Sequence, residues 1–423
     1  MNNVKAMVER YRNLPKIPLA NKIRYVIWKG LFRKLTQDRV VDGSGMLISS
    51  RAIKPHRPKP RSTFETIVSV NGFAWSGSSA VSDLLQEYKN VTSSFGGTLD
   101  DEAEKRNSLR FEFDLVRGAG GVYALEHAFE TSNIFERDAS IRAFMSLAYY
   151  SYVNVRGFYG DDFIEVTRKF VKRLLASEAK SPTGFDYCRH LSGLGTRSAN
   201  FILGHDENDP YQYVYYLKEL TPMEYRAIAA EYIRDVLNLV ESDKFLVMDQ
   251  GCADGSSDVK RFRDYFGPLK MIYVWRDPRD VYSASSAARG CVGFIPEKPV
   301  EFVAWYKRGI GCFDGVKDDN LLLVRFEDLV MDYDRVVAEI EQFLGLNPSD
   351  HIAQKKYFTP SMSYDWSVGR WQFDPDQEGI KYIESQLPQY CWQKPYVRPE
   401  GPRCDHAIDS EDRFEPGHDP LKG

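Results

Sequence analysis

The chain has 423 residues, of which 43% are hydrophobic and 27% are charged, so a disordered or collagen-like protein is excluded. The net charge of −4 argues against general binding to nucleic acid, and we expect no nucleic-acid partner. The charge is unevenly distributed, however. Residues 1–61 carry 15 lysines and arginines against 3 acidic residues, whereas the rest of the chain carries 41 against 57.

The amphipathic segment at residues 22–35 belongs to this basic region. Its apolar residues Ile23, Ile27, Leu31 and Leu35 recur at every fourth position, and lysines and arginines fill much of the remainder. Such a helix could lie on an anionic membrane surface, or it could dock on its own domain or on a partner subunit in a homo-oligomer. A segment rich in proline and cations follows at residues 54–61, so we expect an N-terminal arm and linker over residues 1–62.

Several features are absent from the sequence. It has no run of about 18 apolar residues, which predicts no transmembrane helix. The N-terminus lacks the apolar region of a secretory signal. The six cysteines form no CxxC pair and the seven histidines form no HExxH cluster. We therefore expect reduced thiols, a cytoplasmic location and no metal site.

Short apolar runs and helical patterns make up the remaining chain. Residues 64–70 are rich in β-branched and aromatic residues and predict a strand, which a Gly/Ser loop joins to a helix at 80–88. Residues 100–240 are mostly helical in pattern, and three further apolar runs follow at 245–248, 271–275 and 321–326. Short apolar runs that alternate with helices indicate a parallel sheet covered on both faces. We therefore predict an α/β fold of three α/β/α layers.

The predicted domain boundaries follow from this pattern. One α/β domain extends over residues 63–392, and a large helical insert occupies about 100–240 within it. Residues 393–423 carry five prolines and mixed charge, which predicts an extended polar tail.

A phosphate loop is predicted between the first strand and its helix. Strand, Gly/Ser loop and helix start bring backbone N–H groups and a helix dipole to one point, which favours anion binding. Gly77 permits close approach of a phosphate, and Ser78 and Ser79 add hydroxyl donors. The spacing from Gly72 to Gly77 matches a Walker loop, but Ser78 stands at the position of its lysine, which argues against a nucleoside triphosphatase or kinase. Alternatively, the serine-rich loop only caps a helix.

Two further motifs contain arginines. Arg276 ends the predicted strand at 271–275, and Pro278 then starts a helix. Ligands of open α/β sheets bind at the carboxyl ends of strands, and the planar guanidinium of arginine suits a phosphate. Near the C-terminus, the segment 367–371 reads Ser-Val-Gly-Arg-Trp, in which Gly369 permits a tight turn and Arg370 adds a second cation.

In their order along the chain, these motifs resemble those of the sulfotransferases that use 3′-phosphoadenosine 5′-phosphosulfate (PAPS). The resemblance is closer to the glycan and bacterial branch of P-loop sulfotransferases than to the small-molecule cytosolic branch. The matching segments are Ser76-Gly77-Ser78-Ser79, then Arg276 with Pro278 and Asp280, then Arg325-Phe326-Glu327-Asp328-Leu329, and finally Gly369-Arg370-Trp371.

The resemblance implies roles for these residues. The segment 76–79 would hold the 5′-phosphosulfate, through Ser76, Gly77, Ser78 and Ser79. Arg276 and a nearby serine would hold the 3′-phosphate. The family serine falls on Ala284, and of its two neighbours we prefer Ser285 to Ser283. Residues Ser367, Gly369 and Arg370 would close over that phosphate, with Trp371 beneath them, and the segment 325–329 would be scaffold.

The sequence departs from the family at Trp75, where a lysine or arginine is usual. That cation would stabilise charge on the leaving phosphate, and loss of one such group costs on the order of 10²- to 10³-fold in rate. Either another cation replaces it, with Arg117, Lys260 and Lys307 as candidates, or the protein is a poor catalyst.

Transfer of a sulfuryl group to a hydroxyl also requires a general base. Glu112 lies between two phenylalanines, which favours a raised pKa, and it resembles the glutamate of the glycan and tyrosylprotein branches. Alternatively, Glu112 pairs with Arg110 or Arg117. His205 is the second candidate for the base, and Asp249 is the third.

Together these observations predict an enzyme. It would transfer the sulfuryl group of PAPS, without a metal, to a hydroxyl of a carbohydrate, glycolipid or similar large acceptor. One alternative is a protein of the same fold that binds PAPS or its product adenosine 3′,5′-bisphosphate (PAP) with weak or no catalysis. A P-loop kinase is a less favoured alternative.

Overall fold

The computed structural model describes residues 64–72, 75–93, 115–118, 120–181, 193–206, 212–239, 244–249, 256–287 and 295–403. The chain divides into two compact units, and all of these residues belong to the unit Ser49–Ala407. The basic arm at 1–62, with its amphipathic segment, lies outside the described residues.

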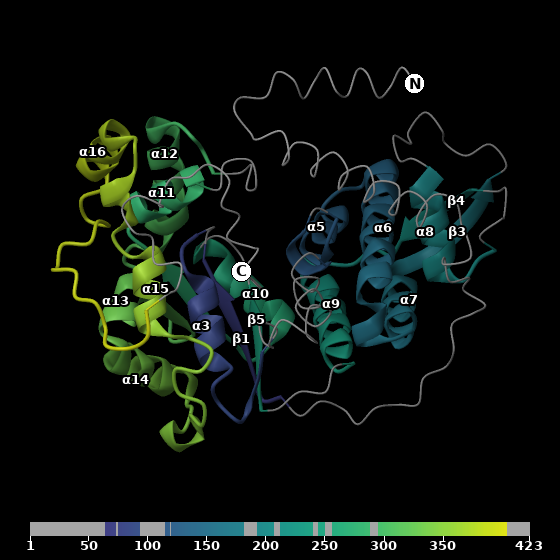
Figure 1. Cartoon of the computed structure of the whole chain (residues 1–423). Helices are drawn as coiled ribbons and strands as arrows, with labels where there is room; N and C mark the ends of the chain where they lie inside the picture. Colours follow the sequence, from purple (N-terminus) through teal and green to yellow (C-terminus); the bar gives the residue numbers. More distant parts are fainter. Residues whose placement is uncertain are drawn as a thin grey trace, which may run out of the picture. The chain divides into compact units, whose positions relative to one another are not determined.

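A five-stranded parallel sheet forms the centre of this unit (Figure 1). Its strand order is β2 (Val91–Ser93), β5 (Phe245–Asp249), β1 (Thr66–Asn71), β6 (Leu269–Trp275) and β7 (Leu321–Arg325). The four apolar runs that the sequence marked as strands are β1, β5, β6 and β7, so the predicted parallel sheet is confirmed. Because the strands are parallel, their carboxyl ends lie along one edge, where ligands of such sheets bind.

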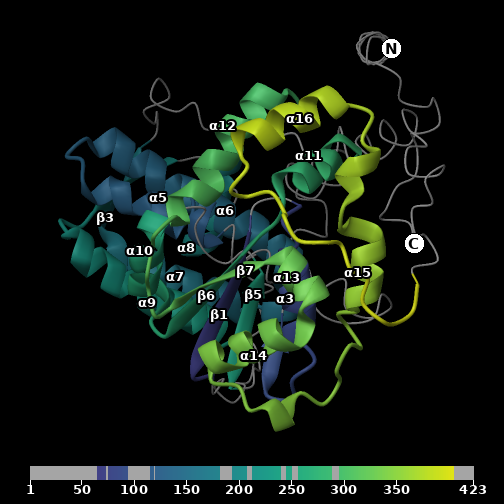
Figure 2. The same cartoon turned by 90° about the vertical axis from the view of Figure 1, so that its left-hand side faces the viewer.

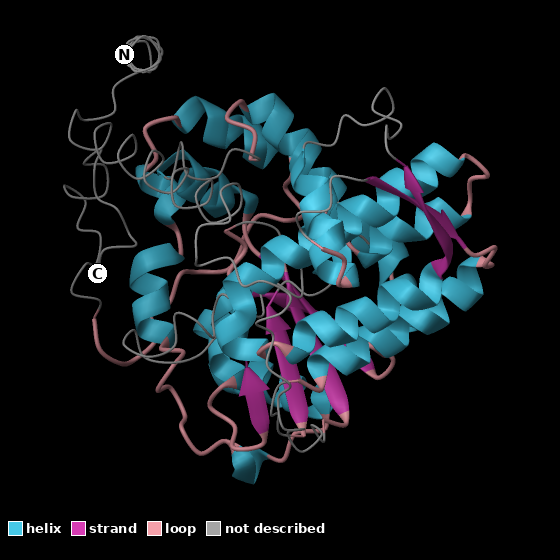
Figure 3. Ribbon diagram, turned by 90° about the vertical axis from the view of Figure 1, so that its right-hand side faces the viewer, coloured by secondary structure: helices cyan, strands magenta, loops and turns pink. Residues whose placement is uncertain are grey.

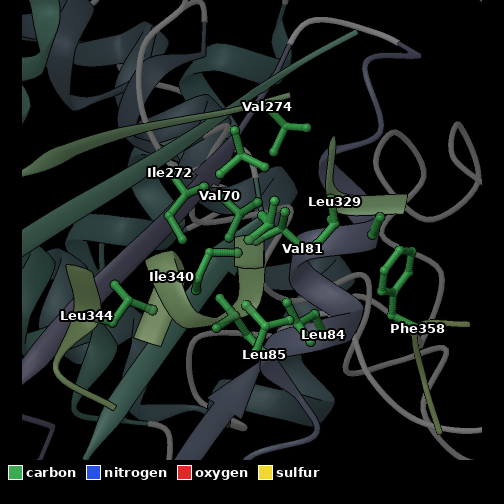
Figure 4. Packing of buried hydrophobic residues seen from close by; sticks show 14 of the residues in the cluster. Val70, Val81, Leu84, Leu85, Ile272, Val274, Leu329, Ile340, Leu344 and Phe358 are labelled. Atoms are coloured by element: carbon green, nitrogen blue, oxygen red, sulfur yellow. The ribbon is translucent and has the colours of Figure 1, made fainter. Parts of the chain in front are cut away.

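One face of the sheet packs against helices α3 (Ser78–Leu85), α13 (Phe326–Met331) and α14 (Tyr333–Leu344). Strand residues alternate between the two faces of a sheet, so Val68 and Val70 of β1 both face this layer. They are fully buried in one cluster with Val81 and Leu84 of α3 (Figure 4). This core fixes α3, and therefore its N-terminus, against the sheet.

The opposite face of the sheet is also covered. Helix α10 (Ser256–Phe266) contacts β6 and the short helix η4 (Gly311–Phe313). On this face Tyr273 of β6 packs on Phe313, with ring centroids 4.1 Å apart. Helices on both faces of a parallel sheet complete the predicted three-layer α/β/α architecture.

An insert between β2 and β5 is mostly helical, as predicted. Its helices are α5 (Val122–Leu125), η2 (Glu126–Phe129), α6 (Ile134–Tyr159), α7 (Asp162–Leu174), α8 (Gly193–Leu203) and α9 (Pro222–Leu237). Thr221 forms a capping box with Glu224 at the start of α9.

The insert also contains a two-stranded antiparallel sheet, which the sequence did not predict. It pairs β3 (Leu175–Ser181) with β4 (Gln212–Leu217) and is separate from the central sheet (Figure 3). Most of the tyrosine-rich segment 211–216 forms β4. Tyr215 is buried there under the guanidinium of Arg142, 4.6 Å from its ring centroid, whereas Tyr216 is exposed. A strand fits this segment because aromatic and β-branched residues pack well on a pleated surface.

The C-terminal third lies partly at the carboxyl edge of the sheet (Figure 2), whereas Asp350 within it bonds to Lys89 and Asn90 directly before β2, at the amino edge. It contains α11 (Pro278–Ala287), α12 (Pro299–Ile310), η5 (Pro348–Asp350), α15 (Pro360–Ser367), η6 (Arg370–Phe373) and α16 (Gln377–Gln386). The chain beyond α16 then returns along α15, where Arg398 pairs with Asp365 at 2.7 Å and Ser361 donates to the carbonyl of Pro402. No helix in the described part of the chain is long and apolar enough to cross a membrane.

Candidate functional site

The phosphate loop joins β1 to α3 at the carboxyl edge of the sheet. Gly77 has a φ of 89° and precedes the first turn of α3, which no side chain caps. A Cβ at Gly77 would lie 2.3 Å from the ring of Phe326, and one at Gly72 would lie 2.1 Å from Oγ of Ser76. Both glycines are therefore required by sterics, and Gly77 also by its φ, because the loop backbone is pressed against its neighbours.

Three of the buried donors without a described partner lie at or beside this loop. Oγ of Ser76 is buried and has no hydrogen-bond partner among the described residues. The same holds for Nδ2 of Asn71, which ends β1, and for Nε of Arg276, which follows β6. Buried donors are normally satisfied, so three orphans around one loop fit an anionic ligand that accepts from them. In the first turn of α3, Ser78 is partly exposed and Ser79 is exposed.

Arg276 bridges the phosphate loop and the segment 367–371. Its Nη1 donates to the carbonyl of Trp75 at 3.1 Å, and its Nη2 donates to the carbonyl of Ser367. The side chain is only 4% exposed, and its guanidinium lies 5.3 Å from the ring centroid of Phe326. The structure thus brings together three of the motifs that the sequence singled out.

Trp75 has an unusual backbone conformation. Its φ is 63°, which is uncommon outside glycine, and its side chain is 37% exposed. Among the described cations, Arg276 contacts the loop here, because it donates to the carbonyl of Trp75. Among the substitutes suggested by the sequence, Lys307 is exposed in the last turn of α12, Arg117 lies in the segment 115–118, and the Lys260 side chain lies outside the described part.

The segment 367–371 turns at Gly369, whose φ is 73°. The carboxylate of Asp280, in the first turn of α11, accepts from the backbone N–H of Gly369 at 2.9 Å and of Trp371 at 3.0 Å. Burial raises the pKa of Asp280, while nearby Arg276 and the two N–H donors oppose this shift. Arg370 is partly exposed in η6.

A second group of buried charges lies beneath this segment. Glu327 accepts from the backbone N–H of Asp277 at 2.8 Å, and its other oxygen lies 3.2 Å from Nε of Arg325. Arg279 pairs with Asp277 at 2.7 Å. Burial raises the pKa of Glu327, and the charge of Asp277 adds to this effect. The segment 325–329 therefore pairs with its neighbours, as expected for scaffold.

The chain beyond α16 contacts the same group. Arg279 donates to the carbonyl of Trp392 at 3.1 Å and stacks over Trp371, 4.1 Å from the ring centroid. Nε1 of Trp371 donates to the hydroxyl of Tyr396 at 3.0 Å. Sequence reasoning missed these contacts, as well as the part played by Asp280. The available signal was the concentration of charge in Arg276-Asp277-Pro278-Arg279-Asp280, directly after a buried strand.

The serine expected to assist Arg276 lies in α11. The hydroxyl of Ser285 donates to the carbonyl of Tyr282 at 2.7 Å and is partly exposed, whereas Ser283 is buried. A hydroxyl bound in this way to its own helix can still accept a hydrogen bond.

The candidates for the general base lie apart from these motifs in the chain. Glu112 lies outside the described residues. His205 follows α8 in the insert, where Nε2 lies 3.0 Å from Glu178 and the ring stacks on Tyr213 at 4.2 Å. Asp249 ends β5 beside Val70 of β1, and its side chain is not described. In the described ranges, no group of His, Cys, Asp and Glu side chains could hold a metal ion.

Comparison with known proteins agrees with this geometry. The family model of the sulfotransferase domain matches residues 265–368, which include β6, Arg276 and β7. No curated protein matches the chain. Among solved structures, the chain is similar to the sulfotransferase domain of the Synechococcus PCC 7002 olefin synthase, with 12% identity over 82% of this chain and 94% of that chain. The TM-score of that comparison is 0.32, so we draw nothing from it. Residues 265–368 of the chain therefore resemble the sulfotransferase domain, and the parallel α/β architecture around them is consistent with that likeness.

Proposed function

We propose that the protein transfers the sulfuryl group of PAPS to a hydroxyl of a carbohydrate, a glycolipid or a similar large acceptor. The observation that carries this proposal is the bridge formed by Arg276 between the carbonyls of Trp75 and Ser367. It joins the loop 76–79, which suits one phosphate, to the segment 367–371, which suits another. PAPS carries phosphate groups at the 5′ and 3′ positions of its ribose.

The described residues fit such a ligand. The uncapped N–H groups of α3 and the orphan hydroxyl of Ser76 would hold the 5′-phosphosulfate. Arg276, with its orphan Nε, and Ser285 would hold the 3′-phosphate, and Ser367, Gly369 and Arg370 would close over it. When bound, PAPS supplies an activated sulfuryl group. The N–H groups and hydroxyls of the loop would orient it and stabilise charge on the leaving phosphate.

The acceptor hydroxyl must lose a proton during transfer. We propose Glu112 as the base, with His205 as the alternative. The carbohydrate or glycolipid class of acceptor is supported by the aromatic insert, in which Tyr216 is exposed. Aromatic faces can stack on sugar rings, although Tyr215 beside it is buried and serves packing.

A second candidate function is nucleotide binding with weak or no catalysis. The specific observation in its favour is Trp75, which places an indole where the family has a cation. A P-loop kinase is less favoured, because Ser78 stands in place of the lysine that such enzymes use.

The cellular setting is proposed from sequence alone. The reduced-type cysteine pattern supports a cytoplasmic protein, and the basic segment 22–35 supports peripheral contact with a membrane or with a second copy of the chain. Flotation with anionic vesicles and sedimentation, each with and without residues 1–62, would test both ideas.

The decisive experiment combines turnover with binding. Purified protein is incubated with labelled PAPS and a panel of glycans and glycolipids, and affinities for PAP and adenosine 5′-phosphate (AMP) are measured by calorimetry. We expect transfer to an acceptor hydroxyl and a preference for PAP that Arg276→Ala abolishes. Arg263→Ala removes an arginine that pairs with Asp318 instead, and it should preserve the preference.

Tight binding of PAP with no transfer to any acceptor would favour the second candidate function. Equal affinity for PAP and AMP in the unmodified protein would contradict the nucleotide assignment itself.

A further inference from the structure

Asp280 joins two features of the candidate nucleotide site, the segment 367–371 and Arg276. It is completely buried, and each of its two carboxylate oxygens accepts one backbone N–H of the segment 367–371. Its Oδ2 also lies 3.9 Å from Nη2 of Arg276. One carboxylate therefore faces both the segment 367–371 and Arg276, which this segment contacts.

The two N–H groups belong to Gly369 and Trp371, on either side of Arg370. Backbone N–H groups that bond to a carboxylate form charge-assisted hydrogen bonds, which are about twice as strong as neutral ones. Gly369 adopts its positive φ without steric cost, but a glycine backbone is conformationally free, so the two hydrogen bonds select this turn from among the alternatives. The Asp280 carboxylate thus fixes the turn.

The same carboxylate orients Arg276. The guanidinium donates through Nη1 to the carbonyl of Trp75 and through Nη2 to that of Ser367, and Asp280 provides the counter-charge beside Nη2. Nε of Arg276 has no partner among the described residues. A planar guanidinium recognises phosphate only in the correct orientation. This arrangement directs both terminal nitrogens to the backbone and leaves Nε, which has no described partner, for a ligand.

The other buried acids in this region have separate partners. Asp277 pairs with Arg279, and Glu327 pairs with Arg325. Among the described carboxylates, Asp280 is the one that lies between Arg276 and the segment 367–371. The contact between Arg276 and the segment 367–371 therefore depends on Asp280 and not on Asp277 or Glu327.

We infer that Asp280 is a positioning residue: it couples Arg276 to the segment 367–371 and thereby sets the preference for a nucleotide with a 3′-phosphate. This inference rests on the proposed function, because it concerns how the proposed PAPS site discriminates between nucleotides. Asp280 is completely buried, so it would act through Arg276 and the segment 367–371 rather than on the nucleotide itself.

The test measures affinities of the full-length protein for PAP and AMP by calorimetry. The variants are Asp280→Asn, Arg276→Ala and the double variant. The asparagine is isosteric, but its amide nitrogen would face an N–H donor, and it lacks the charge beside Arg276. We expect Asp280→Asn to weaken PAP binding by about 10- to 100-fold, the effect of losing hydrogen bonds to a charged group, and AMP binding by less than about threefold.

In the Arg276→Ala background, Asp280→Asn should add little, because positioning acts through Arg276. A merely structural carboxylate would weaken both nucleotides and would act additively. Asp318→Asn is the matched control: Asp318 also accepts a backbone N–H, from Asn320 at 2.9 Å, and pairs with Arg263 at 2.8 Å. It should leave the ratio of the two affinities unchanged.

A measurement on the unmodified protein covers the case in which Asp280→Asn does not fold. Hydrogen exchange of peptides spanning 367–373 should slow in the presence of PAP but not AMP. If exchange there is the same with both nucleotides, or if a folded Asp280→Asn retains the PAP preference, the inference is wrong. If the unmodified protein itself shows no preference for PAP, the proposed function fails instead.

Discussion

The carboxylate of Glu87 lies 2.7 Å from Nε2 of His351, and both side chains are buried although 264 positions separate them in the chain. Glu87 follows α3 and also accepts backbone N–H groups of Lys355, Tyr357 and Phe358. Through this carboxylate, α3, which begins at the phosphate loop, is hydrogen-bonded to the segment that leads into α15 and then to the turn at Gly369.

Removal of this carboxylate should destabilise the protein. Glu87→Ala leaves three backbone donors and His351 without their acceptor, and breaking a buried polar pair in this way costs about 3–5 kcal/mol. Urea unfolding measures the change. Glu339→Ala removes an exposed partner of Arg335 and should cost less than about 1 kcal/mol. Similar losses for both variants would show that the Glu87 bonds are not specific anchors.

Gly77 should tolerate no side chain. Gly77→Ala combines the positive φ with a clash against the ring of Phe326, so we expect loss of stability together with loss of PAP binding. Gly315 has a φ of 74° and no atom within 4 Å of the position that a Cβ would occupy, so Gly315→Ala isolates the cost of φ, about 1 kcal/mol or more. Calorimetry with PAP and thermal unfolding of both variants check this prediction. If both variants lose the same stability and retain the same PAP affinity, close packing of Gly77 against Phe326 has no role.

The hydroxyl of Ser76 should contribute to binding but not to folding. Because its Oγ has no described partner, Ser76→Ala should not lower the free energy of unfolding, yet PAP affinity should fall by about tenfold. Ser82→Ala also removes a buried hydroxyl without a described partner, from the interior of α3, and should leave affinity unchanged. Unaltered affinity of Ser76→Ala would remove Ser76 from the phosphate site.

The acid stability of the insert should depend on Glu126. Burial tends to raise the pKa of this carboxyl, but hydrogen bonds from Arg226 and Tyr265 and the charge of Arg261 hold it below its ordinary value of 4.5. A lowered folded-state pKa stabilises the protein above the unfolded-state value, and this contribution is lost as the pH falls through the folded-state pKa.

Glu126→Gln should therefore destabilise the protein at pH 7, by about 3 kcal/mol, and this difference should shrink as the pH falls below about 4.5. Urea unfolding over a range of pH gives the measurement, and Glu378→Gln, at a position of α16 away from this cluster, is the control. If the difference in free energy of unfolding between the two proteins does not vary with pH, the charge of Glu126 is not the source of this stability.

Trp75 offers a test of catalytic power. If the missing cation limits turnover, Trp75→Lys should raise the rate of sulfuryl transfer by about tenfold or more, towards the 10²- to 10³-fold that such a group contributes. Trp75→Phe retains an aromatic ring and should not. Rates are compared at saturating PAPS. An unchanged rate for Trp75→Lys would indicate that another cation, such as Arg276, already fills this role.

Local features of the site could be predicted from the sequence. The strand, loop and helix around Gly77, and the strand end at Arg276 with a helix starting at Pro278, appear where expected. Each depends on residue preferences within a few positions, such as glycine at positive φ or proline in the first turn of a helix. The antiparallel pair β3–β4 was not predicted, because a short tyrosine-rich run can serve a helix or a strand equally well.

By itself, the sequence determined the composition, the basic charge of residues 1–61, the α/β pattern and the phosphate-loop and arginine motifs. The tertiary structure alone decided which motifs meet: Arg276 with Trp75 across 201 positions, Asp280 with Gly369 across 89, and Glu87 with His351. In each pairing a buried charged side chain meets a polar group from a distant segment: a backbone carbonyl for Arg276, a backbone N–H for Asp280 and an imidazole for Glu87. A buried carboxylate requires partners, but which segment supplies them depends on how the whole chain packs around the sheet.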